Sequence, residues 1–340
     1  MKRFLFGPRF WLASCLAVFV GAVATESSAA GRFREKRQER AAARKEQRQA
    51  QDSGSTSTVA GLTTVNISVG GSPRNYLLYV PKSLEPGAAA PLVVVLHGGG
   101  ANAGKMAEHT GFPELAEKEG FIVAFPNGTT GGPKGGGTWN TGSGKGMGKA
   151  EKREVDDLGF VKAMLAEIKA KYTVDPRRIY ATGVSKGGMF AYYLACNMSD
   201  QFAAIAPVSA TMVNPRCEPA QAVAVLHVHG TKDRNVPLEG GSGDMTGPGY
   251  SYPAVARTID FWKSRDKCQP KETATKVGAD TTCRAYSCSR DVTLCLIEGG
   301  GHGWPGKPAL GWQQKMDVYI TQSFDATAEA WKFFEAHPKP

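Results

Sequence analysis

The sequence predicts a protein of the α/β class, with a mostly parallel central β-sheet and helices on both faces. Three observations predict it. Short apolar runs rich in β-branched residues recur along the chain, segments with helical spacing separate them, and Gly-rich turns follow several of the runs. Strands buried on both faces are continuously apolar, and alternation of such strands with helices is typical of parallel sheets.

The regular pattern begins at about residue 63. The run at 91–96 is apolar throughout, as expected for a strand covered on both faces. Apolar residues at 158, 161, 165 and 168 have helical spacing. The other predicted strands are 64–69, 75–80, 121–125, 178–182, 202–208, 222–228 and 292–297, and the predicted helices are 156–171, 187–196 and 326–336.

The N-terminal part of the chain predicts export. Lys2, Arg3 and Arg9 precede an apolar run, and small residues follow it, which is typical of a secretory signal peptide. We expect a signal peptide at 1–30 and no stable membrane insertion, because the run is too short for a membrane span. A lipid anchor on Cys15 is the alternative.

A basic, low-complexity linker is predicted at 31–60, before a single domain at 61–340. Part of the net charge of +10 lies in this linker, because residues 31–52 hold eight basic side chains against four acidic ones. No basic stripe interleaved with aromatic residues is visible in the domain, so we expect no nucleic-acid partner. The linker is interpreted as solvated, with a role in surface adhesion as the alternative.

Seven cysteines occur in the chain, and six remain after loss of Cys15 with the signal peptide. An even number of cysteines in an exported protein predicts three disulfides, for which 15 connectivities exist. We therefore expect a secreted protein, extracellular or periplasmic. The six are Cys196, Cys217, Cys268, Cys283, Cys288 and Cys295.

Ser185 is the candidate nucleophile, in the G-x-S-x-G run at 183–187 between a predicted strand and a predicted helix. A sharp strand-to-helix turn lifts the hydroxyl clear of the sheet, and small neighbours permit its strained backbone. The motif is weak by itself, since chance matches are common. Its place between strand and helix is what favours a catalytic serine over a Gly-rich turn.

His97 and the three glycines at 98–100 directly follow the strand at 91–96. Glycines there let backbone N–H groups approach a developing oxyanion. We assign the oxyanion hole to the N–H groups of Gly99 and Lys186, with Gly98 as a neighbouring candidate. A phosphate-binding loop is excluded, because no G-x-x-x-x-G-K-[ST] spacing occurs.

Asp233 and His302 complete the catalytic set, each in a loop after a predicted strand. Asp233 is expected to orient an imidazole, and His302 to take the proton of Ser185 and return it to the leaving alcohol. The order Ser185, Asp233, His302 is that of the α/β-hydrolase fold. His227 and His229 face the same side of one strand. They are interpreted as structural, with a metal pair as the alternative.

These motifs together resemble those of a known family, the extracellular polyhydroxybutyrate-depolymerase-like esterases, close to feruloyl and acetylxylan esterases of carbohydrate esterase family 1. The resemblance covers about residues 63–338. It rests on Leu96–Gly100, Phe125–Gly128, Thr138–Asn140, Val155–Asp157, Gly183–Gly188, His229–Asp233 and Gly300–Gly306.

The resemblance implies a secreted serine carboxylic-ester hydrolase that acts through an acyl-enzyme, without metal or organic cofactor. It places Ser185, Asp233 and His302 on the triad, and Trp139 and Trp304 at the substrate. The substrate is expected to be a small, oligomeric or polymeric ester, and the lack of a recognisable polymer-binding domain favours soluble esters. A peptidase is a minor alternative. A non-catalytic carbohydrate-binding or adhesion protein on this fold is the alternative from another class.

Two features depart from the family pattern. Lys186 stands where relatives often have Asn or Ser, and the loop at 130–153 is rich in Gly and Lys. Together they favour an acidic substrate or product, with a solvated loop as the alternative.

The cysteine pairing follows partly from geometry. In a hairpin at 281–298 centred near Ser289, Cys283 lies opposite Cys295, so a cross-strand bridge is expected. Cys196 closes a helix and Cys217 follows the next strand, which favours their pairing. Cys268 then remains with Cys288.

Overall fold

The structure is a computed structural model that describes residues 59–130, 136–246 and 250–340, all within one unit spanning Ser55–Pro340. The predicted signal peptide lies outside the described residues, as does nearly all of the predicted linker at 31–60. Both stay predictions. Among the described residues, no helix is both long and apolar enough to span a membrane.

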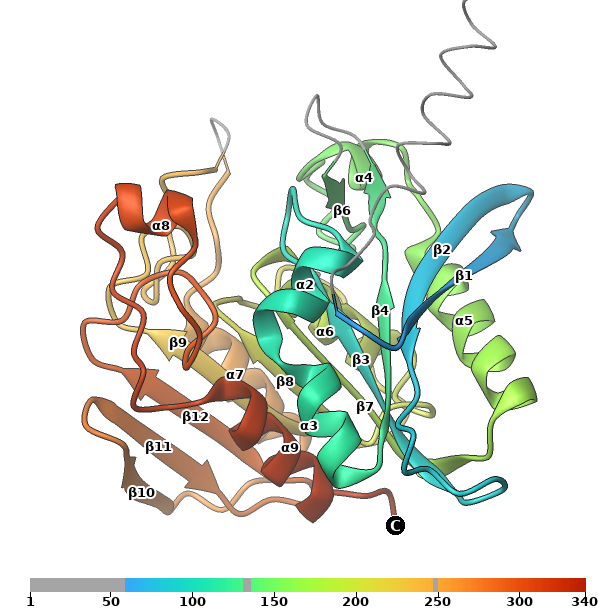
Figure 1. Cartoon of the computed structure of the whole chain (residues 1–340). Helices are drawn as coiled ribbons and strands as arrows, with labels where there is room; N and C mark the ends of the chain where they lie inside the picture. The colour runs from blue at the N-terminus through green and yellow to red at the C-terminus, as the bar shows by residue number, and fades with distance from the viewer. Residues whose placement is uncertain (1–58, 131–135, 247–249) are drawn as a thin grey trace, which may run out of the picture. The chain divides into compact units, whose positions relative to one another are not determined.

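A ten-stranded sheet forms the centre of the described part, in the order β1-β2-β4-β3-β7-β8-β9-β12-β11-β10 (Figure 1). The strands from β4 to β12 in this order pair in parallel, and antiparallel strands flank them on both sides. The sheet strands are β1 (Leu62–Val69), β2 (Ser72–Tyr79), β3 (Ala90–Leu96), β4 (Ile122–Pro126), β7 (Val174–Val184), β8 (Ala204–Val208), β9 (Ala224–Gly230), β10 (Glu272–Val277), β11 (Thr281–Tyr286) and β12 (Val292–Ile297). This is the mostly parallel sheet that the sequence predicts.

Helices cover both faces of the sheet. The longer helices are α2 (Ala103–Thr110), α3 (Phe112–Glu119), α5 (Asp157–Lys171), α6 (Lys186–Asn197), α7 (Val255–Arg265) and α9 (Ala326–Ala336). Two short helices, α4 (Lys149–Lys152) and α8 (Gly311–Lys315), and a small pair of strands, β5 (Thr129–Thr130) and β6 (Gly137–Thr138), lie in the connecting loops.

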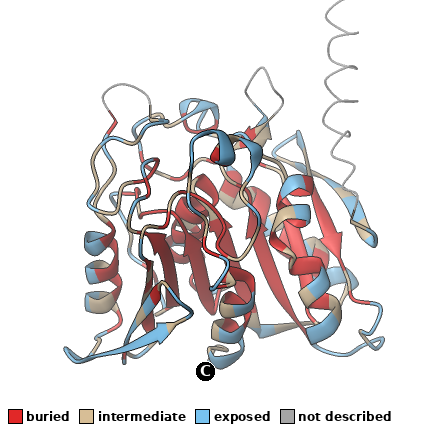
Figure 2. Cartoon of the chain, turned by 60° about the vertical axis from the view of Figure 1, so that its left-hand side comes forward, coloured by how far each residue is buried: buried red, intermediate tan, exposed pale blue. Residues whose placement is uncertain are grey.

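Two apolar clusters form the core, one on each face of the sheet. Side chains of α5, α6 and α7 pack in one cluster, and side chains of α2, α3 and α9 pack in the other. The central strands are buried along their length, as Figure 2 shows in red. All residues of β3 are buried, which explains why this run carries no polar side chain.

Among the described residues, the helices α2, α3, α4, α7 and α8 and the strands β5, β6 and β10 were not predicted from the sequence. α2 and α3 are short, with eight residues each, and polar residues interrupt their apolar pattern. α7 has buried residues at 255, 259 and 262, a helical spacing that the sequence displays. β10 is exposed along most of its length and therefore lacks the apolar alternation of a half-buried strand.

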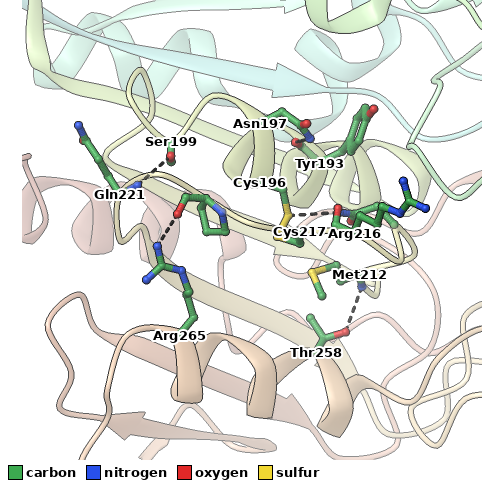
Figure 3. The surroundings of a disulfide bond; sticks show 12 residues. Tyr193, Cys196, Asn197, Ser199, Met212, Arg216, Cys217, Gln221, Thr258 and Arg265 are labelled. Atoms are coloured by element: carbon green, nitrogen blue, oxygen red, sulfur yellow. Dashed lines mark hydrogen bonds between the residues drawn. A yellow bond between two sulfur atoms is a disulfide. The ribbon is translucent and has the colours of Figure 1, made fainter.

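Three disulfides join the cysteines as the sequence analysis expects. They are Cys196–Cys217, Cys268–Cys288 and Cys283–Cys295. The last one crosses β11 and β12, where its two residues lie directly opposite each other. Figure 3 shows the first, which ties the end of α6 to the segment between β8 and β9. There the backbone N–H of Gln221 also donates to the Ser199 hydroxyl.

Removing the Cys196–Cys217 bridge tests its contribution to stability. The bridge closes a loop with a sequence separation of 21 residues. We expect the double variant Cys196→Ala/Cys217→Ala to lose about 3 kcal/mol in the free energy of unfolding, because the open chain has more conformational entropy. Urea denaturation measures this loss. An unchanged midpoint would show that the bridge does not constrain the unfolded chain.

Candidate active site

The predicted catalytic residues lie in loops that follow neighbouring parallel strands. His97 follows β3, Ser185 follows β7, Asp233 comes shortly after β9 and His302 after β12. Because the carboxyl ends of parallel strands meet at one edge of a sheet, the fold gathers residues that are far apart in the sequence. Helices α4 and α8 belong to loops at this edge (Figure 1).

Ser185 stands on a sharp turn between β7 and α6. Its backbone has φ 56° and ψ −121°, a region that residues with a side chain rarely adopt. A Cβ atom at Gly187 would lie 2.2 Å from the carbonyl oxygen of Leu96, and one at Gly183 would lie 2.6 Å from the same atom. Both positions therefore require glycine. The G-x-S-x-G pattern is explained by this close approach of two backbones.

His302 and Asp233 form a direct hydrogen bond. Nδ1 of His302 lies 2.8 Å from one carboxylate oxygen of Asp233, and both side chains are largely buried. The other oxygen accepts the backbone N–H groups of Asn235 and Val236, each at 2.9 Å. Burial alone would raise the pKa of Asp233, but His302, His229 and the N–H of Val236 hold it below its ordinary value. The carboxylate is therefore charged and fixed in orientation.

Ser209 connects the turn of Ser185 with the loop of His302. The backbone N–H of Ser185 donates to the carbonyl of Val208. Ser209, which follows Val208, donates its hydroxyl to the carbonyl of Gly303. Among the described contacts, the hydroxyl of Ser185 itself makes no hydrogen bond. The structure thus joins Asp233 to His302 directly, and it connects the turn of Ser185 to the loop of His302 through Val208 and Ser209.

His97 organises the Gly-rich loop after β3. Its Nδ1–H donates to the carbonyl of Gly98, and its Nε2 accepts the backbone N–H of Gly128 at 2.9 Å. Burial lowers the pKa of His97 to about 4, so the ring is neutral at physiological pH and keeps one accepting nitrogen. Sequence reasoning placed His97 in the oxyanion motif, and the structure shows that it anchors this loop.

The glycines of this loop lie over the turn of Ser185. A Cβ at Gly99 would lie 3.7 Å from the Cβ of Lys186, and one at Gly98 would lie 3.6 Å from the Cβ of Ser185. The N–H of Gly100 is committed to the carbonyl of Gly137. Lys186 is the first residue of α6, where a backbone N–H has no partner within the helix. The two residues assigned to the oxyanion hole thus lie close to each other.

The side chain of Lys186 is buried and paired. Its Nζ lies 3.4 Å from one carboxylate oxygen of Glu151. The other oxygen of Glu151 accepts hydrogen bonds from the Ser143 hydroxyl and the Met147 backbone N–H. Burial lowers the pKa of Lys186 to about 8, although Glu151 opposes this shift. The cation beside Ser185 is therefore neutralised by a partner. This argues against the expectation that it selects an acidic substrate.

Trp139 and Trp304 are both buried, so neither ring presents a free surface, and their contact with substrate stays a prediction. Trp139 stacks on Phe190 and donates its Nε1–H to the carbonyl of His97. Trp304 donates its Nε1–H to the hydroxyl of Thr327 at the start of α9. Both rings pack against other core side chains and hold neighbouring segments by one hydrogen bond each. Sequence position alone does not reveal which way a ring points.

Trp312 is the aromatic residue that sequence reasoning missed. It is partly exposed on α8, and its ring centre lies 6.4 Å from that of His302. Its neighbour Gln313 donates to the carbonyl of His302, which ties this helix to the catalytic loop. Three exposed hydrophobic side chains lie near Trp312 in the sequence: Leu310 precedes it, and Met316 and Tyr319 follow it.

His227 and His229 are completely buried on β9 and hydrogen-bonded to each other at 3.1 Å. Their ring nitrogens are engaged with protein groups, which supports the structural interpretation over a metal pair. Within the described part of the chain, no group of three or more candidate ligands is placed to hold a metal ion.

Sequence comparison identifies the family. The family described as "Esterase PHB depolymerase" matches residues 74–260, more than half of the chain. The chain belongs to this family. Its relatives include feruloyl esterase B of Piromyces equi, 30% identical over 250 residues that cover 70% of this chain and 44% of that protein. This chain thus spans less than half of the Piromyces enzyme.

One further relative and one solved structure match most of the domain. Feruloyl esterase C of Emericella nidulans is 26% identical over 272 residues, which cover 77% of this chain and 84% of that protein. The solved structure of an acetyl xylan esterase from Aspergillus awamori matches with a TM-score of 0.52 at 17% identity, over 75% of this chain and 98% of that one. The latter similarity shows the α/β-hydrolase fold.

A matched pair of tryptophan variants tests the role of Trp139. In Trp139→Phe and in Trp304→Phe, the ring packing is largely kept and one hydrogen bond of about 1 kcal/mol is lost. We expect similar losses of stability in both. Only Trp139→Phe should lower kcat, by about 3- to 10-fold, because its partner carbonyl belongs to the loop beside Ser185. Ester hydrolysis assays and thermal unfolding measure the two effects, and equal kcat losses would contradict this role.

Proposed function

We propose that the protein hydrolyses carboxylic esters with Ser185 as nucleophile. The observation that carries this proposal is the buried Asp233–His302 hydrogen bond at the sheet edge where the strained turn presents Ser185. Membership of an esterase family supports the same reaction. A binding protein has no need of a strained serine or a buried acid–base pair.

The residues act in two half-reactions. His302 accepts the proton of Ser185 as its oxygen attacks the ester carbonyl, and Asp233 stabilises the resulting imidazolium. The N–H groups of Gly99 and Lys186 donate to the developing oxyanion. The C–O bond of the ester breaks, and the leaving alcohol takes the proton from His302. Water then attacks the acyl-enzyme by the same route, which releases the acid and restores Ser185.

The surroundings of the site favour neutral esters with an apolar or aromatic part. Trp312 offers a partly exposed ring beside His302, and the positive charge of Lys186 is paired with Glu151. Relatives in the family include enzymes named as feruloyl esterases. We therefore favour soluble aryl or hydroxyacyl esters as substrates over anionic ones.

Three disulfides and the predicted signal peptide support export to an extracellular or periplasmic location. Disulfides form and persist in such oxidising compartments.

Ser185→Ala tests the nucleophile. We expect the variant to lose at least about 1,000-fold in kcat, because removal of the nucleophile leaves only binding and oxyanion stabilisation. The substrates are p-nitrophenyl acetate, methyl ferulate, acetylated xylan and polyhydroxybutyrate. Equal rates for the wild type and the variant would overturn the assignment. Inactivity of the folded wild type on the whole panel would favour the non-catalytic binding protein.

Trp312→Ala tests the substrate contact. We expect KM for methyl ferulate to rise by about 10-fold, since stacking on an aromatic side chain contributes on the order of 1 kcal/mol beyond area burial. KM for acetylated xylan, which has no aromatic ring, serves as a reference for damage to the neighbouring His302 loop. A loss of kcat that is equal for both esters would indicate that Trp312 only supports this loop.

A further inference from the structure

A chain of three buried side chains runs from the helix of the nucleophile to the loop of the catalytic acid. The hydroxyl of Tyr192, on α6, lies 2.7 Å from Nδ1 of His227 on β9. Nε2 of His227 lies 3.1 Å from Nδ1 of His229, and Nε2 of His229 lies 2.8 Å from the carbonyl oxygen of Val236. All three side chains are fully or almost fully inaccessible.

With one proton on each ring, the Val236 end of the chain sets the direction of every hydrogen bond in it. The carbonyl of Val236 can only accept, so Nε2 of His229 carries a hydrogen and its Nδ1 accepts. His227 must then donate from Nε2 and accept at Nδ1. That leaves the hydroxyl of Tyr192 as the donor at the far end. The network thus assigns the Nε2–H tautomer to both histidines.

Burial keeps this chain neutral. It lowers the pKa of His227 well below the ordinary histidine value, with a further contribution from His229. It also lowers the pKa of His229 and raises that of Tyr192 well above its ordinary value. Each ring therefore holds one proton, and the hydroxyl keeps its own, as the hydrogen-bond directions require.

The chain ends on the loop that holds the catalytic acid. His229 donates to the carbonyl of Val236, and the N–H of Val236 donates to Asp233 at 2.9 Å. Nε2 of His229 also lies 3.6 Å from the second carboxylate oxygen of Asp233. At the other end, Tyr192 is about two helical turns from Ser185 on the same helix.

We propose that Tyr192, His227 and His229 are positioning residues that hold Asp233 in place relative to the helix of Ser185. This rests on the proposed ester hydrolysis. The carbonyl of Val236 selects the Nε2–H tautomers, and the hydroxyl of Tyr192 completes the chain by donating to Nδ1 of His227. The Nε2–H tautomer of His229 presents an N–H group to Val236 and Asp233. With the other tautomer, a bare nitrogen faces a carbonyl and a carboxylate, which repel it.

Tyr192→Phe tests this proposal because it removes only the terminal donor. Tyr180→Phe is the matched control: Tyr180 is a buried tyrosine on β7 whose hydroxyl has no hydrogen-bond partner in the described part of the chain. We expect Tyr192→Phe to lower kcat on p-nitrophenyl acetate by about 5- to 20-fold with KM within about twofold, since a mispositioned acid affects the chemical step. Tyr180→Phe should keep kcat within about twofold.

Nitrogen-15 NMR of the histidine rings gives a readout that packing alone does not change. In the wild type, His227 and His229 should both show the Nε2–H tautomer, and in Tyr192→Phe a measurable fraction should change to Nδ1–H. An Nδ1–H tautomer in the wild type, or unchanged tautomers and kcat in the variant, would overturn the proposal. So would equal kcat losses in Tyr192→Phe and Tyr180→Phe.

A second variant covers the case in which Tyr192→Phe fails to fold. His227→Phe keeps a ring of similar size but removes the donor to His229, and the same loss of kcat is expected. Thermal unfolding checks that each variant is folded. If the folded wild type hydrolyses no ester, the proposed function fails, whereas the tautomer measurements still decide whether the chain is ordered as described.

Discussion

The close approach of the β3 end to the turn after β7 is the constraint on which the rest of the site depends. The carbonyl oxygen of Leu96 occupies the space that a side chain at Gly183 or Gly187 would need. This contact places the Gly-rich loop next to the turn of Ser185, with Gly99 close to Lys186. The strained backbone of Ser185 is maintained because the pairing of β3 with β7 fixes the two segments that meet there.

Buried polar groups that are either neutral or paired with a partner stabilise this contact between β3 and the turn after β7. His97 is kept neutral by burial and bridges two loops, while Trp139 holds its carbonyl. A buried ion pair between Arg74 and Asp157 fixes the neighbouring segment, because Asp157 also accepts the N–H of Asn140. Such groups are costly to bury alone, so each one ties a specific partner to the catalytic edge.

Ser185, Asp233 and His302 could be proposed as nucleophile, acid and base from the sequence because their motifs follow strands that apolar runs indicate. Parallel strands place such loops at one edge, so the order Ser185, Asp233, His302 was informative without coordinates. The pairing of Cys283 with Cys295 was predictable for a related reason, since the register of a hairpin follows from its turn. α7 was missed although its spacing is visible, and β10 was missed because an exposed edge strand has no apolar alternation.

The sequence by itself determined the α/β class, the α/β-hydrolase order of the catalytic motifs and the number of cysteines available for pairing. Only the tertiary structure decided which of the three tryptophan rings near the site is exposed to solvent. Trp139 and Trp304 turn inward, whereas Trp312 lies beside His302. It likewise paired Lys186 with Glu151 and joined Tyr192 to His229 through His227. The physical reason is that strand order and periodicity are local properties, whereas side-chain direction and charge pairing depend on contacts between distant segments.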